Sequence, residues 1–414
     1  MAVTAAVTSV NVLSVIHYPI FGGPHNRVSI VAKLLEARGV KTTVLLPDGG
    51  EAAAQRMSDN GVETLTMPLH RLRSIPDPRL QLVWLKDMRR EVVAITDLIR
   101  RRGIDVVAVN ALANPHGAFA ARRAGVACVW ELIDTFPPAW MRHAYMPLVM
   151  RYSDVVMTTG RRVAEMHPGT TRLDDRWVMF FPSVDVELFR ADAEARRRSR
   201  VELGFPADST VVGNVATLNP MKGHRHFIRA AAELRATHPN VRFAILGSKD
   251  AEREPYYRQL WGEAEALGLR MGTDLVVRDP GTRVCELAQA FDLFWMTSEP
   301  RSEGIPTAIG EAKALGIPVV ATDVGSTAEC VRHGVSGFLT PPRDAAAIAA
   351  AGRRILDDPD LMASMQAAAR YEAERDYSAE RGAEQHLIAY ERAIAHRAAR
   401  VGDRSVRRRR KAPK

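Results

Sequence analysis

The sequence predicts an α/β protein that contains two doubly wound parallel sheets in tandem. Short apolar runs alternate along the chain with helical segments, as is typical of parallel sheets covered by helices on both faces. The length of 414 residues exceeds what one hydrophobic core usually organises, which favours two or three domains. The runs expected to form strands are 10–16, 43–46, 105–110, 127–132, 154–159, 178–181, 210–216, 241–246, 275–277, 293–296 and 318–321.

Composition narrows the class of protein further. The chain is 46% hydrophobic and 25% charged, which is typical of a globular protein. No apolar run approaches the roughly 18 residues that a membrane-spanning helix needs. The first apolar run has no basic segment before it, so we interpret it as a strand and not as a signal peptide. The three cysteines, Cys128, Cys285 and Cys330, are far apart and favour neither disulfides nor zinc. A reducing cytoplasm is therefore expected.

The positive charge is concentrated at the end of the chain. The formal net charge is +9, and residues 400–414 hold eight Lys or Arg and one Asp. The rest is nearly neutral and carries no nucleic-acid-binding motif, so nucleic acid is not an expected partner. The tail is either a solvated segment without a role or an attachment to an anionic membrane surface. A second Arg-rich segment, 68–90, is either a helix with a solvated basic face or an interfacial patch.

One strand–helix–strand unit, residues 291–325, carries the most informative residues. Its polar loop, 297–306, follows a strand and precedes a helix that Pro306 and Thr307 start, and loops in that position bind ligands in open α/β sheets. Glu303 lies in the loop, and Glu311 lies eight positions later in the helix. The N–H groups of a helix start suit a phosphate, and carboxylates suit sugar hydroxyls. The alternative is that both glutamates are ordinary solvated charges.

Three other positions have a similar functional interpretation. Lys222 stands in a loop before a helix, where a phosphate could bind, although a surface lysine is the alternative. Gly22 and Gly23 follow the first strand and allow close approach to a ligand, but many turns contain two glycines. His116 follows Pro115 at the end of a strand, and a single histidine is more often structural.

The string from Ser302 to Gly325, SEGIPTAIGEAKALGIPVVATDVG, resembles the retaining glycosyltransferases of family 4. The resemblance covers nearly the whole chain and is strongest over residues 211–342. It implies the GT-B fold, with two Rossmann-like doubly wound domains that face each other across a cleft and a C-terminal helix that crosses back to the N-terminal domain. The expected divisions are 1–190 for the acceptor-side domain, 191–377 for the nucleotide-sugar-binding domain, 378–400 for the returning helix and 401–414 for a disordered basic tail.

The resemblance also implies a reaction. The family moves a sugar from a nucleotide-diphosphate sugar to an acceptor with retention of anomeric configuration and without a metal ion or other cofactor. The acceptor, a glycan, a lipid-linked molecule or a small molecule, would enter from the N-terminal side. The implied location is cytoplasmic, with the inner face of the membrane as an alternative for a peripheral protein.

The resemblance assigns roles to individual residues. Glu311 would hold the ribose hydroxyls, Glu303 the hydroxyls of the donor sugar, and Lys222 the diphosphate, while His116 and Gly23 would face the donor. The implied catalytic residues are Glu303, His116 and Lys222. The implied donor-binding residues are Gly22, Gly23, Thr217, Lys222, Gly304, Ile305, Pro306, Thr307 and Glu311.

Thr217 departs from the family pattern, because family members have an arginine five positions before the lysine. Arg225, Arg283 or Arg301 could supply the missing charge, and the sequence does not choose among them. Two other functions stay open: a GT-B nucleotide-sugar epimerase or hydrolase, and a sugar-nucleotide-binding scaffold without turnover. The D-x-D motif of residues 358–360 resembles a metal-binding pattern of another fold, but its position favours a helix cap.

Overall fold

The computed structural model describes the backbone of residues 9–70, 78–133, 135–248, 254–301 and 303–410, and the side chains of these except 78–85 and 402–410. The chain divides into two compact units. Unit 1 comprises Met1–Ser183 with Ala379–Lys414, and unit 2 comprises Val184–Ser378. The expected division at residue 190 is therefore seven residues too late. The charged segment that suggested it lies inside unit 2, in helix α7 (Ala193–Glu202).

Unit 1 contains a seven-stranded parallel sheet in the order β3-β2-β1-β4-β5-β6-β7. Its strands are β1 (Val10–Val15), β2 (Val40–Pro47), β3 (Glu63–Met67), β4 (Val106–Asn110), β5 (Ala127–Leu132), β6 (Val155–Thr159) and β7 (Trp177–Phe180). Its helices are α1 (Gly23–Glu36), α2 (Glu51–Asp59), α3 (Pro78–Arg102), α4 (His116–Ala124), α5 (Ala139–Tyr152), α6 (Arg161–Met166) and α15 (Ala379–Arg410), with the 3₁₀ turns η1 (Thr170–Arg172) and η2 (Asp174–Arg176).

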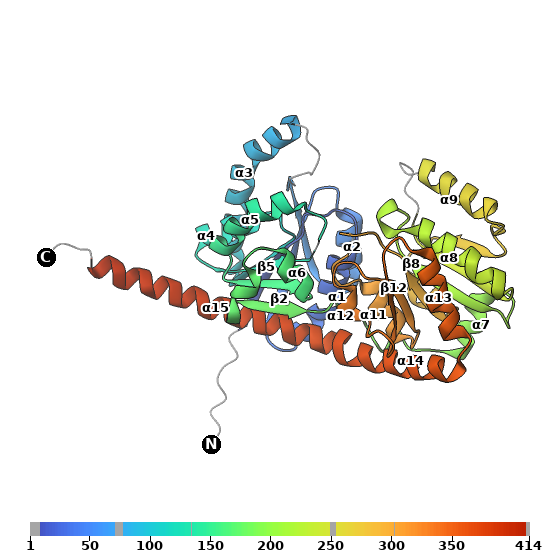
Figure 1. The fold of residues 1–414 in the computed structure, drawn as a ribbon. Coiled ribbons are helices and arrows are strands. Elements are labelled where there is room, and N and C mark those ends of the chain that lie inside the picture. The colour runs from blue at the N-terminus through green and yellow to red at the C-terminus, as the bar shows by residue number, and fades with distance from the viewer. Residues whose placement is uncertain (1–8, 71–77, 134, 249–253, 302, 411–414) are drawn as a thin grey trace, which may run out of the picture. The chain divides into compact units, whose positions relative to one another are not determined.

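Helices cover both faces of the sheet of unit 1. Side chains from α3, α4 and α5, among them Ile95 and Val149, form one core with one face. Side chains from α1 and α15, among them Leu35 and Tyr390, form a second core with the other face (Figure 1). This double coverage explains why every residue of β4, β5 and β6 is buried and why most of these residues are apolar.

Unit 2 contains a six-stranded parallel sheet in the order β10-β9-β8-β11-β12-β13. Its strands are β8 (Thr210–Val215), β9 (Val241–Leu246), β10 (Leu275–Arg278), β11 (Leu293–Met296), β12 (Val319–Thr322) and β13 (Gly337–Thr340). Besides α7, its helical segments are η3 (Pro220–Lys222), α8 (His224–Thr237), α9 (Glu254–Ala266), α10 (Val284–Ala288), α11 (Thr307–Ala314), α12 (Thr327–Cys330), α13 (Ala345–Leu356), α14 (Pro359–Glu372) and the π-helical turn η5 (Ala373–Tyr377).

The core of unit 2 centres on Trp295 of β11. Its ring lies 5.6 Å from that of Phe227 on α8 and 6.0 Å from that of Phe243 on β9, measured between ring centroids. Helices α8 and α13 pack side by side over this cluster (Figure 1). A Cβ added to Gly352 of α13 would lie 2.6 Å from the Trp295 ring, so only glycine lets this helix approach so closely.

The expected strands form in both units within a few residues of their predicted limits. The sequence did not predict β3 and β13, which are short edge strands. The first helix begins at Gly23, directly after the loop that follows β1, because Pro24 fits a first helical turn. The expected helix in the second Arg-rich segment is α3, but residues 71–77 and the side chains of 78–85 lie outside the described part of the chain.

Two expectations concern the C-terminal part of the chain. The last helix packs on α1 and on β5, β6 and β7 of unit 1, as expected. The expectation that it ends at residue 400 and gives way to disorder is wrong, because α15 continues to Arg410. Between residues 401 and 410 only Gly402 strongly disfavours a helix, and no proline interrupts the segment. Asp358 caps α14 by accepting a hydrogen bond from the Leu361 N–H at 2.9 Å.

Each sheet has one place where the strand order reverses direction. It lies between β1 and β4 in unit 1 and between β8 and β11 in unit 2. At such a place the chain leaves the two neighbouring strands in opposite directions. A crevice therefore opens outside the carboxyl ends of these strands, and ligands bind there in open α/β sheets. In the part of the chain that the structure describes, no helix is long and apolar enough to cross a membrane.

In unit 2 the two loops at this reversal are joined by their backbones. The Glu299 N–H donates to the Met221 carbonyl at 2.8 Å, and the Thr297 hydroxyl lies 3.1 Å from the Gly223 carbonyl. Gly223 has a φ of +65°, and a Cβ there would lie 1.9 Å from the Thr297 carbonyl oxygen. Only glycine therefore permits both this conformation and this approach.

We expect Gly223→Ala to destabilise unit 2 by about 2–5 kcal/mol, from the left-handed backbone and the overlap with Thr297. The matched control is Gly204→Ala, since Gly204 also has a positive φ of +75° but no atom lies within 4 Å of the added Cβ. Gly204→Ala should lower the free energy of unfolding only by the cost of the left-handed backbone, about 1–2 kcal/mol. Urea unfolding of both variants measures the difference. Equal losses of unfolding free energy in the two variants would show that the approach of Gly223 to Thr297 is not tight.

Candidate functional site

Lys222 and Glu303 lie 81 positions apart in the sequence and meet at the reversal of unit 2. The Lys222 Nζ donates to the Glu303 Oε1 at 2.6 Å, and the Ser298 hydroxyl donates to the same oxygen at 2.6 Å. Glu303 is only 6% exposed, which strengthens the attraction within the pair. Lys222 follows β8 and Glu303 follows β11, so the sheet topology brings two sequence-predicted residues together.

A second glycine supports the backbone of Glu303. Gly325 has a φ of +51°, and a Cβ there would lie 1.8 Å from the Glu303 carbonyl oxygen. The Ser326 N–H donates to the Gly304 carbonyl at 3.2 Å, and the Thr322 hydroxyl donates to the Ser298 carbonyl at 2.7 Å. Sequence reasoning missed Ser298 and Gly325 as supports. The position of Ser298 just after a strand was the available signal.

The start of α11 presents open backbone N–H groups. Pro306 is the cap residue and Thr307 the first residue of the helix. Within the described residues, the N–H groups of Gly304, Ile305 and Thr307 have no acceptor. Pro306 has no N–H, so it contributes only by fixing the turn. These groups carry part of the positive end of the helix dipole and suit an anion.

Glu311 lies one turn into α11, in different surroundings from Glu303. It lines a small, largely apolar cavity with Val215, Ala288 and Phe291. Burial of its carboxyl raises its pKa to about 7. Among the described residues this carboxyl makes no ion pair, and it would gain from hydrogen-bond donors such as ligand hydroxyls.

The position of the missing arginine holds an exposed threonine. The Asn219 side chain donates to the Thr217 hydroxyl at 2.9 Å, which fixes the turn but supplies no charge. Two of the possible substitutes are already engaged: Arg225 binds Glu263, and Arg283 binds Glu202 and Glu286. Arg301 pairs with no carboxylate among the described residues.

In unit 1, His116 is part of a chain of ionisable side chains, of which His17, His116 and Glu91 are buried. His17 Nε2 lies 3.1 Å from His116 Nδ1, and His116 Nε2 lies 3.2 Å from Glu91 Oε2. The other Glu91 oxygen lies 2.5 Å from His70 Nδ1. Burial lowers the pKa of His116 to about 4 and that of His17 well below its usual value. Both imidazoles are therefore neutral near pH 7.

Strand order explains why these residues meet. His17 follows β1 and His116 begins α4 after β4, the two strands that flank the reversal of unit 1. Gly117 lets α4 pack closely on the sheet, because a Cβ there would already lie 3.0 Å from Val109. His17 directly follows a predicted strand, so its role could have been suspected. Nothing in the spacing of Glu91 pointed to His116.

The two glycines after β1 have different roles. The Gly22 N–H donates to His25 Nδ1 at 3.2 Å, while His25 Nε2 donates to the Tyr18 carbonyl at 3.0 Å. The Gly22 N–H is therefore already used within the loop. Gly23 is the first residue of α1, a position that suits contact with an anion. No group of three or more His, Cys, Asp or Glu side chains that could hold a metal exists among the described residues.

Two family models match the chain. Residues 22–167 match the Glycosyl transferase 4-like domain, and residues 195–372 match Glycosyl transferases group 1. In fold, the chain resembles the crystal structure of the HepE protein of Anabaena in complex with UDP, with a TM-score of 0.76, 22% identity and coverage of 91% of this chain and 98% of that one. Two Rossmann-like units of this kind define the GT-B class of fold. The chain therefore carries a Glycosyl transferase 4-like domain followed by a Glycosyl transferases group 1 domain.

Curated relatives share part of the chain. A D-inositol 3-phosphate glycosyltransferase of Thermobispora bispora is 33% identical over 259 residues, which is 60% of this chain and 58% of the relative. A GDP-mannose-dependent alpha-(1-6)-phosphatidylinositol monomannoside mannosyltransferase of Mycolicibacterium smegmatis is 33% identical over 195 residues, or 46% of this chain and 50% of the relative. The chain thus spans about half the length of the curated relatives that it matches.

We expect Glu311→Gln to raise stability in a pH-dependent way. Because burial holds the folded-state pKa of Glu311 near 7, above its unfolded value, the glutamate makes the protein less stable as pH rises from about 4.5 to 7. The glutamine variant does not undergo this pH-dependent loss of unfolding free energy. The difference in unfolding free energy between this variant and the wild type should be small at pH 5 and largest at pH 8.

Urea unfolding at the two pH values measures this difference. Glu265→Gln is the control, since Glu265 lies exposed on α9 and its change should show no such dependence. A Glu311→Gln advantage that is the same at pH 5 and pH 8 would contradict the raised pKa.

Proposed function

We propose that this protein transfers a sugar from a nucleotide-diphosphate sugar to an acceptor hydroxyl, with retention of configuration and without a metal ion. The observation that carries the proposal is the Lys222–Glu303 pair, placed where the strand order reverses and beside the open N–H groups of α11. A cation and helix-start donors suit a diphosphate. A nearby carboxylate suits sugar hydroxyls.

Each residue then has a role in one reaction. The bond between the anomeric carbon and the diphosphate oxygen breaks, and the electron pair leaves with the diphosphate. The acceptor oxygen attacks from the same face, and its proton passes to the departing phosphate oxygen. Lys222 and the N–H groups of Gly304, Ile305 and Thr307 stabilise the charge that develops on the leaving group.

Glu303 orients the hydroxyls of the donor sugar, and Glu311 accepts from the ribose hydroxyls. On nucleotide binding, the Glu311 carboxyl gives up its proton, because hydroxyl donors favour the charged form. We propose His116 as a catalytic residue of unit 1, with its neutral imidazole oriented by His17 and Glu91. Gly23, at the start of α1, and the exposed Thr217 are further donor contacts.

The names of the relatives support this class of substrates. One relative is named for transfer to an inositol phosphate, and another for use of GDP-mannose with a lipid-linked acceptor. We therefore propose a nucleotide-diphosphate sugar as the donor and a glycan, lipid-linked or small-molecule acceptor. Thr217 favours a second candidate, a scaffold that binds sugar nucleotides without turnover, because it removes one expected cation from the phosphate site.

We expect Lys222→Ala to lower the transfer rate about 10²–10³-fold, which is typical of one lost transition-state donor. The donor is first found by thermal shift with a panel of nucleotide sugars, and transfer is then followed with and without EDTA. Arg258→Ala, at an exposed position of α9, is the control and should act like the wild type.

Three results would count against the proposal. If no nucleotide sugar raises the melting temperature, the donor site is wrong. Binding without donor consumption over a broad acceptor panel would favour the scaffold. Loss of activity in EDTA that magnesium or manganese restores would refute the metal-free reaction.

We further propose that the basic tail holds this protein at an anionic membrane surface, in a cytoplasmic location at the inner face. Arg407–Lys411 supplies five adjacent positive charges, worth roughly 1 kcal/mol each near such a surface.

Deletion of residues 404–414 should reduce cosedimentation with anionic liposomes at low salt and leave transfer to a water-soluble acceptor unchanged. Zwitterionic liposomes are the control, and high salt should abolish the difference. Equal cosedimentation of both proteins would exclude the tail as the anchor.

A further inference from the structure

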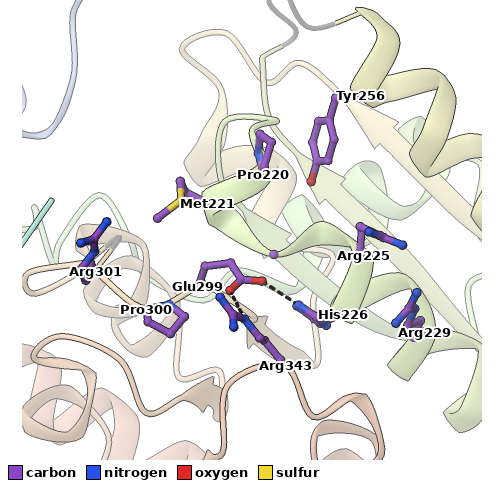
Figure 2. Close-up of a pocket in the computed structure, with 11 residues that line it drawn as sticks. Pro220, Met221, Arg225, His226, Arg229, Tyr256, Glu299, Pro300, Arg301 and Arg343 are labelled. Atoms are coloured by element: carbon purple, nitrogen blue, oxygen red, sulfur yellow. Dashed lines mark hydrogen bonds and ion pairs between the residues drawn. The ribbon is translucent and has the colours of Figure 1, made fainter. Parts of the chain in front are cut away.

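Unit 2 has a second cavity, of about 690 Å³, that the proposed reaction does not use. Side chains from η3, α8, α9, the loop after β11 and the segment after β13 line it (Figure 2). Four of them are arginines: Arg225, Arg229, Arg301 and Arg343. Its volume lies in the range of sites that bind small molecules.

The cavity is separated from Lys222 and Glu303 by the two joined loops. Glu299 and Met221, which share a backbone hydrogen bond, line the cavity. Their neighbours Ser298 and Lys222 contact Glu303 instead. Successive residues of these loops therefore serve different sites, and a ligand in the cavity would not occupy the donor site.

The cavity has an excess of positive charge. Glu263 accepts from Arg225 at 2.9 Å and from Arg229 at 2.6 Å, while Glu299 accepts from Arg343 at 2.6 Å and from His226 at 2.8 Å. Two carboxylates thus stand against four guanidinium groups, and Arg301 pairs with no described carboxylate. The excess matches the charge of a phosphate monoester, about −1.5 to −2 near pH 7.

The guanidinium groups also keep donors available. Arg225, Arg229 and Arg343 make their ion pairs through Nε, so these bonds do not use their terminal Nη groups. Paired N–H donors of this kind match the oxygens of a phosphate. Glu299, the carboxylate that lines the cavity, is itself held by Arg343 and His226, which reduces its repulsion of an anion.

One more donor points to a ligand. The Tyr256 hydroxyl is buried and has no hydrogen-bond partner among the described residues, although it points toward the cavity (Figure 2). Leaving such a group unpaired is unfavourable, and a ligand that accepts its hydrogen bond would remove that cost. Burial raises the pKa of Tyr256 to about 12, so the hydroxyl keeps its proton at neutral pH and can donate it to an acceptor.

The backbone of two of the arginines is also unusual. Arg301 has a φ of +66° and Arg343 a φ of +67°, a left-handed conformation that is unfavourable for a residue with a side chain. Both side chains line the same cavity. Strain of this kind often accompanies a functional constraint.

We propose that this cavity binds a small phosphorylated molecule, with the phosphate held by Arg301 and Arg343 and another oxygen of the ligand accepting from the Tyr256 hydroxyl. Arg225 and Arg229 complete the positive wall through the Nη groups that their ion pairs with Glu263 leave available. The rest of the ligand fills the remaining volume along Met221 and Pro300. This inference does not depend on the proposed transferase reaction, because it uses a different cavity.

Isothermal titration calorimetry of the full chain tests the proposal, with inorganic phosphate, glycerol 3-phosphate and glycerol as probes at constant ionic strength. Both phosphates should bind, glycerol 3-phosphate at least as tightly as phosphate, and glycerol should not. The double variant Arg301→Gln/Arg343→Gln should lose about tenfold or more in affinity, and Tyr256→Phe about threefold to tenfold. Arg258→Gln, exposed on the same helix as Tyr256, is the control and should bind like the wild type.

Two further variants distinguish loss of phosphate binding in the cavity from unfolding and from binding at the donor site. The single change Arg301→Gln breaks no described ion pair, so it should lower affinity without unfolding the protein. Lys222→Ala should bind both phosphates like the wild type. The proposal is overturned if neither phosphate binds, if glycerol 3-phosphate binds more weakly than phosphate, if the arginine variants bind unchanged, or if Lys222→Ala abolishes binding, because the anion would then occupy the donor site.

Discussion

The backbone contact between the loops after β8 and β11 is the constraint on which the sites of unit 2 depend. Gly223 and Thr297 approach so closely that no side chain fits between them, and the Glu299–Met221 hydrogen bond closes the same junction. The junction directs Lys222 and Ser298 to Glu303 on one side. It directs Met221 and Glu299 to the arginine-lined cavity on the other. One close backbone contact thus creates two separate chemical environments.

Burial sets the charge of the remaining ionisable groups. His17 and His116 are almost completely buried and neutral, whereas Glu303 is buried but paired with Lys222. Glu311 has no such partner among the residues that the structure describes, and burial raises its pKa to about 7. The two glutamates of one motif therefore differ in their chemistry. One is a carboxylate held in a bond to a cation, and the other is poised to change charge when donors arrive.

Both units follow the same plan despite different surroundings. In each, residues that follow the two strands at the reversal of the sheet meet: His17 and His116 in unit 1, Lys222 and Glu303 in unit 2. Glycine is required beside each pair, because the loops pack closely on the sheet or on each other. Gly117 and Gly325 are the positions where this requirement is most direct.

The sequence by itself determined the fold class, because apolar runs that are buried on both faces of a sheet leave a local pattern in the chain. It also located Lys222, Glu303 and His116 after predicted strands and Glu311 in the helix that follows Glu303, because a distinctive string and strand–loop–helix units are local features too. It could not determine that Lys222 bonds to Glu303 or that Glu91 lies beside His116, since these contacts join residues far apart in the chain. The four arginines of the second cavity likewise come from three separate segments and form no motif. Only the tertiary structure brings such side chains together, because charge pairing and burial depend on distance in space and not on distance along the sequence.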